Sequence, residues 1–164
     1  MNKGKILLLL LSLPIYVFPQ NNNKVPCSSP EFNQFDFWLG KWDLFYSDSM
    51  HATNQITKDL DGCVIFENFN DPKQQFKGKS WSVYNPAKQR WEQTWVDNQG
   101  AYITLTGAFE NDKMTLSTAP GISQKRMIFY NVKESALDWV WESTTDSGRT
   151  WKQLWKIHYT RLSK

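Results

Sequence analysis

The chain has 164 residues, of which 40% are hydrophobic and 15% aromatic, so it can form one domain with a substantial core and is not a disordered segment. Its formal net charge of +3 comes from 19 basic and 16 acidic residues, and the basic residues are dispersed among the acidic ones. Nucleic-acid binding needs a clustered basic surface, so this partner class is excluded.

Residues 1–20 have the pattern of a secretory signal peptide. Lys3 and Lys5 precede an apolar run from Ile6 to Phe18, which is too short to span a bilayer as a helix. Without these two lysines the 19 basic residues fall to 17, against 16 acidic residues, and no transmembrane segment remains. We therefore predict an exported protein, periplasmic or secreted, with a retained N-terminal anchor as the alternative.

A polar leader over residues 21–31 contains Cys27, and Cys63 follows in "LDGCVIF". Because exported proteins fold in an oxidising compartment, this pair predicts a disulfide. It would close a loop of about 36 residues and stabilise the fold by about 3 to 4 kcal/mol. Lipidation of Cys27, which the preceding Val25-Pro26 does not favour, and two free thiols are the alternatives.

Residues 32–164 are predicted to form one all-β domain. Short turns rich in Asn, Asp, Gly and Pro separate ten segments with alternating hydrophobicity. These segments lie near residues 41–48, 52–59, 62–70, 75–84, 90–97, 101–110, 113–118, 124–132, 136–144 and 150–161. Hairpin connections exclude a parallel sheet and favour an up-and-down antiparallel β-barrel, with an open or Greek-key sandwich as the alternative. The preceding "SPEFNQFDFWLG" has no period of two and predicts a short helical turn that plugs one end.

The glycine-flanked aromatic stretch at the first strand resembles a known superfamily. Gly40-Lys41-Trp42 is similar to the G-x-W signature of the lipocalins and their calycin relatives, in which an arginine from the last strand packs across the tryptophan. "YTRL" places Arg161 at the corresponding position. Four longer stretches resemble a family of exported bacterial proteins with a calycin-like domain of unknown function: "QFDFWLGKWDL", "LDGCVIFE", "YNPAKQRWEQTWVD" and "WESTTDSGRTW". The resemblance implies a fold and an extracytoplasmic location but no activity.

The chain has nine tryptophans, and several polar residues alternate with period two on the same strand faces as aromatic residues. These residues indicate what the interior of the barrel contains. Trp139 and Trp141 fall on one face of a strand, and they either fill the core or line a pocket. Glu67 and Gln93 share faces with aromatic residues, and if those faces point inward these two side chains need hydrogen-bond partners or a ligand. The alternative places Glu67 in solvent. The candidate ligand contacts are Trp42, Glu67, Trp81, Gln93, Trp95, Arg126, Trp139, Trp141 and Tyr159.

"TTDSGRTW", residues 144–151, matches the Asp-box of sialidase propellers. The Asp-box is a hairpin device, and this chain is too short for a multi-bladed propeller. We therefore predict a structural role for Asp146, Gly148 and Trp151.

The two histidines do not predict a cofactor. A nitrobindin-like branch of the calycins holds haem through a histidine, but His158 is out of phase with the inward pattern of its strand and is expected to point outward. The spacing of His51 and His158 indicates no metal site. The function predicted from the sequence is binding of a small apolar or amphipathic molecule. The alternatives are a hydrolase or isomerase that uses Glu67, and an interaction module with a filled interior.

Overall fold

The computed structural model describes residues 25–47 and 50–162. The signal peptide predicted over residues 1–20 lies outside the described residues. Within them, no helix combines the length and hydrophobicity needed to cross a membrane.

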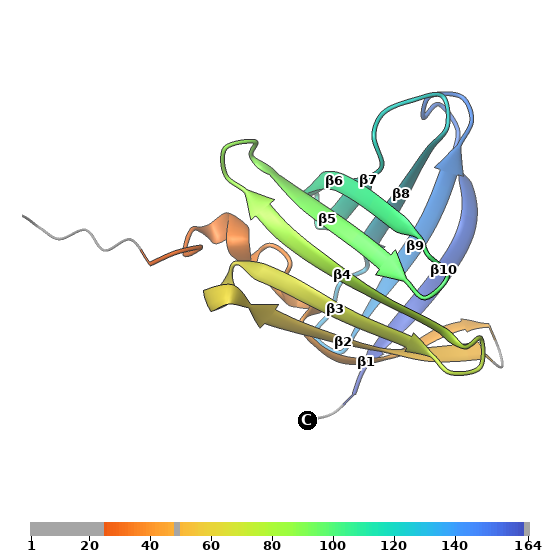
Figure 1. Ribbon diagram of the computed structural model, residues 1–164, viewed down its shortest axis with the longest axis horizontal. Coiled ribbons are helices and arrows are strands. Elements are labelled where there is room, and N and C mark those ends of the chain that lie inside the picture. Colours follow the sequence, from red (N-terminus) through yellow and green to blue (C-terminus); the bar gives the residue numbers. More distant parts are fainter. Residues whose placement is uncertain (1–24, 48–49, 163–164) are drawn as a thin grey trace, which may run out of the picture.

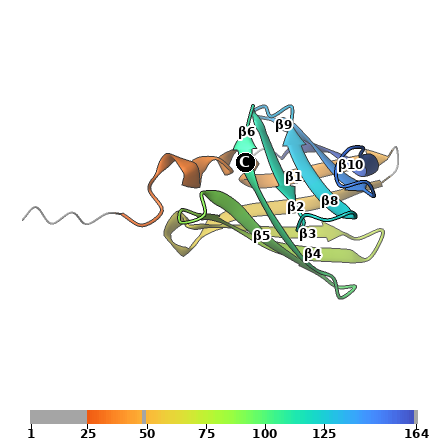
Figure 2. The same cartoon turned by 90° about the horizontal axis from the view of Figure 1, so that it is seen from above.

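Ten antiparallel strands close into a single barrel (Figures 1 and 2). They are β1 Gly40–Ser47, β2 Met50–Asp59, β3 Val64–Asp71, β4 Phe76–Asn85, β5 Arg90–Asp97, β6 Tyr102–Glu110, β7 Lys113–Ser117, β8 Gln124–Tyr130, β9 Ala136–Thr144 and β10 Lys152–Arg161. Each strand pairs with its neighbours along the chain, and β1 pairs with β10 to close the ring. The predicted all-β, up-and-down barrel is confirmed, and the sandwich alternative is excluded.

Strand β4 shows how the period of two builds the wall of the barrel. Gly78, Ser80 and Ser82 are buried and face inward, whereas the alternating Lys79 and Trp81 are exposed. The inward positions carry small side chains because larger side chains from neighbouring strands occupy the space in front of them.

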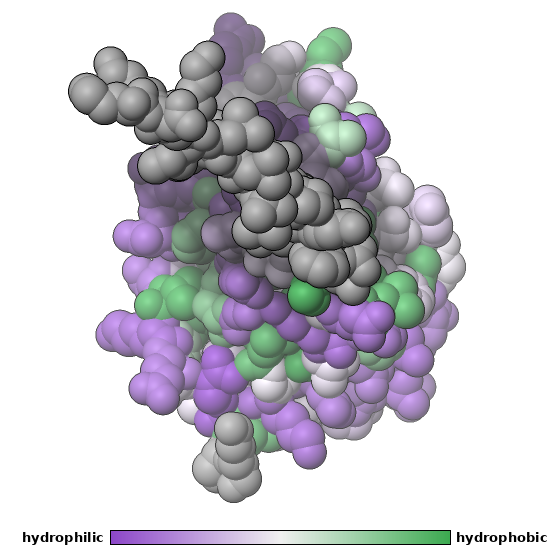
Figure 3. Space-filling model, turned by 90° about the vertical axis from the view of Figure 1, so that its left-hand side faces the viewer, coloured by the Kyte–Doolittle hydropathy of each residue, from purple (hydrophilic) through white to green (hydrophobic). Residues whose placement is uncertain are grey.

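The N-terminal segment plugs one end of the barrel with two short 3-10 turns, η1 Pro30–Asn33 and η2 Asp36–Trp38, as the aperiodic stretch predicted. Phe35 is fully buried between them, with its ring 5.3 Å from that of Trp91 and 5.2 Å from that of Phe129. We call this end of the barrel the plugged end. It lies on the left in Figure 1, beside the β2–β3 and β4–β5 connections, and the β3–β4 and β5–β6 connections lie at the other, distal end. Viewed from the plugged end, hydrophilic and hydrophobic residues are interspersed on the described part of the surface (Figure 3).

Arg161 fastens this plug to the last strand. Its Cζ lies 4.1 Å from the centre of the Trp42 ring, and its guanidinium donates hydrogen bonds to the carbonyl oxygens of Phe37, Leu39 and Glu134. Gly40 has a φ of +123°, and a Cβ there would lie 2.5 Å from Arg161 Nη1. Glycine at position 40 is therefore required both by the backbone conformation and by the arginine.

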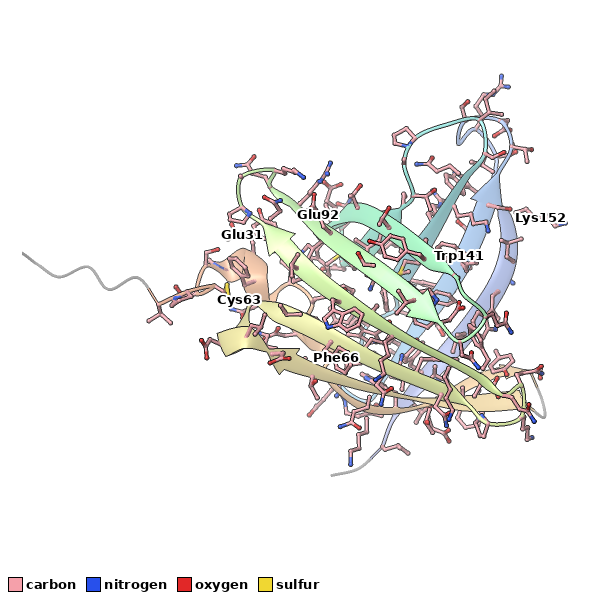
Figure 4. All side chains as sticks on the ribbon, in the orientation of Figure 1. Glu31, Cys63, Phe66, Glu92, Trp141 and Lys152 are labelled. Carbon is pink, nitrogen blue, oxygen red and sulfur yellow. A yellow bond between two sulfur atoms is a disulfide. The ribbon has the colours of Figure 1, made fainter. Side chains whose placement is uncertain are left out.

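Cys27 and Cys63 form a disulfide, as predicted. The bond ties the N-terminal segment to the residue that precedes β3, on the same end of the barrel as the plug (Figure 4). A third short 3-10 turn, η3 Leu60–Gly62, leads into Cys63 and ends at a glycine with a φ of +88°.

Candidate ligand-binding cavity

The barrel encloses a cavity of about 190 Å³. Nine aromatic rings and four aliphatic or thioether side chains make most of its wall, and Glu67 and Asp97 are the two carboxylates in it. The lining residues are Trp38, Glu67, Phe69, Phe76, Trp95, Asp97, Ile103, Leu105, Met127, Phe129, Trp139, Trp141, Trp155, Ile157 and Tyr159.

Tryptophan rings form the distal part of the wall. Trp139 and Trp141 are parallel, with centroids 6.4 Å apart, and Trp155 stands perpendicular to Trp139 at 5.6 Å. The ring of Phe69 lies 6.1 Å from those of Trp95 and Trp155. Trp95, Trp141 and Trp155 are only partly buried, so the cavity reaches the surface at the distal end, and Trp141 lies on the side of the barrel away from the plugged end (Figure 4).

Asp97 holds Trp95 and the β5–β6 turn in place. Its carboxylate accepts hydrogen bonds from Trp95 Nε1 at 3.0 Å and from the backbone N–H groups of Gln99 and Ala101 at 2.9 and 3.0 Å. Burial opposes ionisation, but these three donors outweigh it and hold the pKa of Asp97 below its usual value. Asp97 is therefore ionised at the rim of the cavity, and both of its carboxylate oxygens already accept hydrogen bonds from the protein.

Glu67 is the polar group at the inner part of the cavity. Only 6% of the residue is exposed. Its Oε1 accepts a hydrogen bond from Asn54 Nδ2 at 2.7 Å, and its Oε2 accepts one from Ser80 Oγ at 2.5 Å. Burial raises the pKa of Glu67 to about 7, although both hydrogen bonds favour the ionised form. Glu67 therefore changes charge near neutral pH.

A row of buried polar side chains continues from Glu67 across β4 and β5. Gln93 Nε2 donates hydrogen bonds to Ser80 Oγ at 3.3 Å and to Ser82 Oγ at 2.8 Å. Among the described residues, Gln93 Oε1 and Asn54 Oδ1 are buried without a hydrogen-bond partner. These polar groups hold the carboxylate of Glu67 in one position, because Ser80 bonds to both Glu67 and Gln93.

Two further polar groups of the lining come from the plug and from β10. Tyr159 is 3% exposed, and burial together with the negative charge of Glu67 raises the pKa of its phenol well above the usual range. It therefore remains a hydrogen-bond donor at physiological pH. Trp38 is 1% exposed, and side-chain hydrogen bonds from Asn54 and Trp38 favour the ionised phenol without outweighing the burial of Tyr159.

Five of the nine ligand contacts proposed from the sequence come together at the cavity. They are Glu67, Trp95, Trp139, Trp141 and Tyr159. Trp42 is buried beneath Arg161 at the plugged end, and Gln93 is buried behind the lining, where it contacts Ser80 and Ser82.

Trp81 and Arg126 lie outside the cavity, contrary to the interior positions expected for them. Trp81 is 43% exposed and packs on Phe66, with centroids 5.4 Å apart on the outer face of the barrel. Arg126 bonds to Glu142 at 2.7 Å and lies 3.9 Å above the ring of Trp151. The physical reason is the alternation of faces along each strand. The inward residues of β4 are its small ones and those of β8 are Met127 and Phe129, so Trp81 and Arg126 lie on the outward faces.

Several lining residues were not singled out from the sequence. Phe69 is in phase with Glu67, and Trp155 and Ile157 are in phase with Tyr159, so the period of two places them on the inward face, although they were not proposed as ligand contacts. Trp38 could not be assigned in this way, because it comes from the plug rather than from a strand.

The remaining sequence motifs lie on the outer surface. His158 points outward and contacts Asp138, with Nδ1 and Oδ1 2.8 Å apart, so it does not reach the cavity. In the described ranges no three His, Cys, Asp or Glu side chains gather into a metal-binding group. Asp146 accepts hydrogen bonds within the 144–151 hairpin, from Thr150 N at 2.9 Å and from Thr144 Oγ1 at 2.7 Å. These bonds, with the one from the Thr150 hydroxyl foremost, lower the pKa of Asp146 to about 2.

Comparison with known proteins adds no functional assignment. Neither the protein-family models nor the curated proteins contain a match to this chain.

Proposed function

We propose that the barrel binds a small, largely apolar molecule in its interior. The observation that carries this proposal is a cavity of about 190 Å³ whose wall is mostly aromatic and whose inner part holds the carboxylate of Glu67 and the phenol of Tyr159. An apolar wall with a few fixed polar groups is the usual composition of a small-molecule site.

The volume restricts the size of the ligand. An apolar cavity of about 150 Å³ accommodates benzene, and sites for drug-sized ligands begin at about 300 Å³. A compound with one or two rings therefore matches the cavity, whereas the chain of a fatty acid or an isoprenoid would extend beyond its distal end.

The calycin resemblance supports the same proposal. Barrels of this class commonly enclose a ligand site, and the stacking of Arg161 on Trp42 is the contact that the resemblance implies. The open interior also argues against the alternative of an interaction module with a filled barrel.

Intrinsic tryptophan fluorescence tests the proposal directly. Trp95, Trp139, Trp141 and Trp155 line the cavity, so titration with toluene, cyclohexanol and benzyl alcohol, which do not emit where tryptophan does, is expected to change the emission saturably. Trp95→Ala should weaken binding, and Trp81→Ala is the matched control because it removes an indole from the outer face. The proposal fails if neither these probes nor a wider apolar panel gives a saturable change with folded protein.

A second candidate is an enzyme in which Glu67 transfers a proton. Its position in the cavity and its pKa of about 7 favour a general acid or base in a hydrolase or isomerase. In that case a screen of small esters and enolisable ketones would find a turnover that Glu67→Gln abolishes while ligand binding is retained. Binding without any turnover would favour the first proposal.

We also propose that the mature protein acts outside the cytoplasm. The apolar run after Lys3 and Lys5 and the disulfide between Cys27 and Cys63 support this location. Fractionation of expressing cells, followed by N-terminal sequencing of the exported form, is expected to place cleavage between residues 18 and 23. Recovery of the uncleaved chain in the cytoplasm would contradict export.

A further inference from the structure

The charges around the cavity have one sign. Glu67 and Asp97 are its two carboxylates, and among the described residues no Lys, Arg or His lines it. The faces of the nine aromatic rings in the wall are also negative, because the π-electrons lie above and below the ring plane. A bound anion would therefore meet two carboxylates without a compensating cation, whereas a bound cation would be attracted by both carboxylates and by the faces of the aromatic rings.

We propose that the ligand is a small organic cation, an alkylammonium group attached to an aromatic or cyclic body, which places its ammonium group against Glu67 and its ring among Trp95, Trp139 and Trp155. This inference rests on the proposed binding function and narrows its ligand class. It excludes carboxylate ligands, because their charge would have the same sign as those of Glu67 and Asp97.

Glu67 rather than Asp97 is assigned as the partner of the ammonium group. Asp97 already accepts hydrogen bonds from Trp95, Gln99 and Ala101. Each oxygen of Glu67 accepts one hydrogen bond, from Asn54 or from Ser80, and each has a second lone pair. The uncharged phenol of Tyr159, from β10, is the one titratable group beside Glu67 that the described residues supply, and Asn54 and Ser80 do not titrate.

Cation binding must then release a proton. Because burial raises the pKa of Glu67 in the empty protein to about 7, part of the molecules carry the protonated carboxyl at pH 7. The ammonium ion favours the carboxylate, so the carboxyl O–H bond ionises and the proton passes to the buffer as the cation binds. An alkylammonium group has a pKa near 10 and keeps its own protons at this pH.

Three probes of similar shape test the inference by calorimetry at pH 7: 2-phenylethylammonium, the neutral 2-phenylethanol and the anionic phenylacetate. The ammonium compound is expected to bind about tenfold tighter than the alcohol, because a hydrogen bond to a charged group is stronger than a neutral one, and phenylacetate should bind most weakly. Titrations in two buffers with different ionisation enthalpies should show net proton release for the ammonium probe and none for the alcohol.

Glu67→Gln should abolish both the proton release and the preference for the ammonium probe, with binding of 2-phenylethanol retained. Glu92→Gln, which removes a carboxylate that is ion-paired with Lys88 and Arg90 away from the cavity, is the matched control and should keep both. If 2-phenylethanol binds as tightly as the ammonium probe, or if no proton is released, the cation inference is wrong while the binding function stands. If none of the three probes binds but the neutral apolar panel does, the cation inference is again wrong and the binding function stands; if the apolar panel also fails, both are wrong. Should Glu67→Gln not fold, proton release in the unmodified protein decides the question.

Discussion

The indole of Trp95 lies in the space that a side chain at Gly78 would occupy. The two residues belong to the paired strands β5 and β4, and a Cβ at position 78 would overlap the ring atoms Cζ2 and Cη2 of Trp95. The missing side chain of Gly78 therefore allows Trp95 to lie against β4 as part of the cavity wall.

Gly78→Ala is expected to push Trp95 away from β4 and into the cavity. Overpacking of this kind costs about 1 to 3 kcal/mol, which urea denaturation would detect as a lower free energy of unfolding. Probe binding should weaken at the same time. Gly121→Ala is the matched control, because its Cβ would have its nearest contact at an ordinary 3.6 Å, from Ser123 O. Equal stability of the two variants would show that Trp95 can move without cost.

Arg161→Lys is expected to destabilise the barrel by about 3 kcal/mol, although it keeps the charge. The planar guanidinium bonds to three backbone carbonyls, those of Phe37, Leu39 and Glu134, while it lies on Trp42. A single ammonium group cannot satisfy this arrangement. Chemical denaturation measures the change, and Arg149→Lys, at an exposed arginine in the 144–151 hairpin, should have little effect. A similar loss in both variants would remove the special role assigned to Arg161.

The strands of the barrel could be predicted because alternation and turn chemistry agree along the chain. In β4, for example, exposed Lys79 alternates with buried Ser80, and the strand ends at Asn85, directly before Pro86 in the turn. The strand bounds predicted from these signals lie within two residues of those observed.

The site was less predictable because large aromatic residues occur on both faces of the strands. Trp81 was expected to belong to the apolar cavity wall, but β4 must present Gly78 and Ser80 to the interior, where Trp95 and Glu67 occupy the space. The need for small inward residues on β4 arises from side chains on β5 and β3, so the sequence of β4 alone does not predict it. The volume of the cavity depends on the packing of all ten strands and of the plug, so no local pattern predicts it.

Reduction of the disulfide between Cys27 and Cys63 is expected to lower the free energy of unfolding by about 4 kcal/mol. The bond closes a loop with a sequence separation of 36 residues, so its loss enlarges the entropy of the unfolded chain. Thermal unfolding of the paired Cys27→Ser and Cys63→Ser variant, compared with the oxidised protein, measures the effect. Two reactive thiols in the denatured, unreduced protein would contradict the bond itself.

The buried carboxyl of Glu67 should make the protein less stable as the pH rises towards neutrality. Its pKa is about 7 in the folded protein and 4.5 when unperturbed, so between these values the folded state holds a proton that the unfolded state has lost. This contribution is fully present below pH 4.5 and disappears as the pH rises through 7. Its full size is about 3 kcal/mol.

Urea denaturation at a series of pH values from about 5 to 8 measures this contribution, because the midpoint for the unmodified protein should fall steadily over that range. Glu67→Gln cannot titrate and should give a nearly flat profile. The lowered pKa values of Glu92 and Asp146, both about 2, have the opposite sign and act in more acidic solution, so they do not obscure the trend. A midpoint that rises with pH in the unmodified protein would show that the folded state favours the charged form of Glu67, which would also remove the basis for proton release on cation binding.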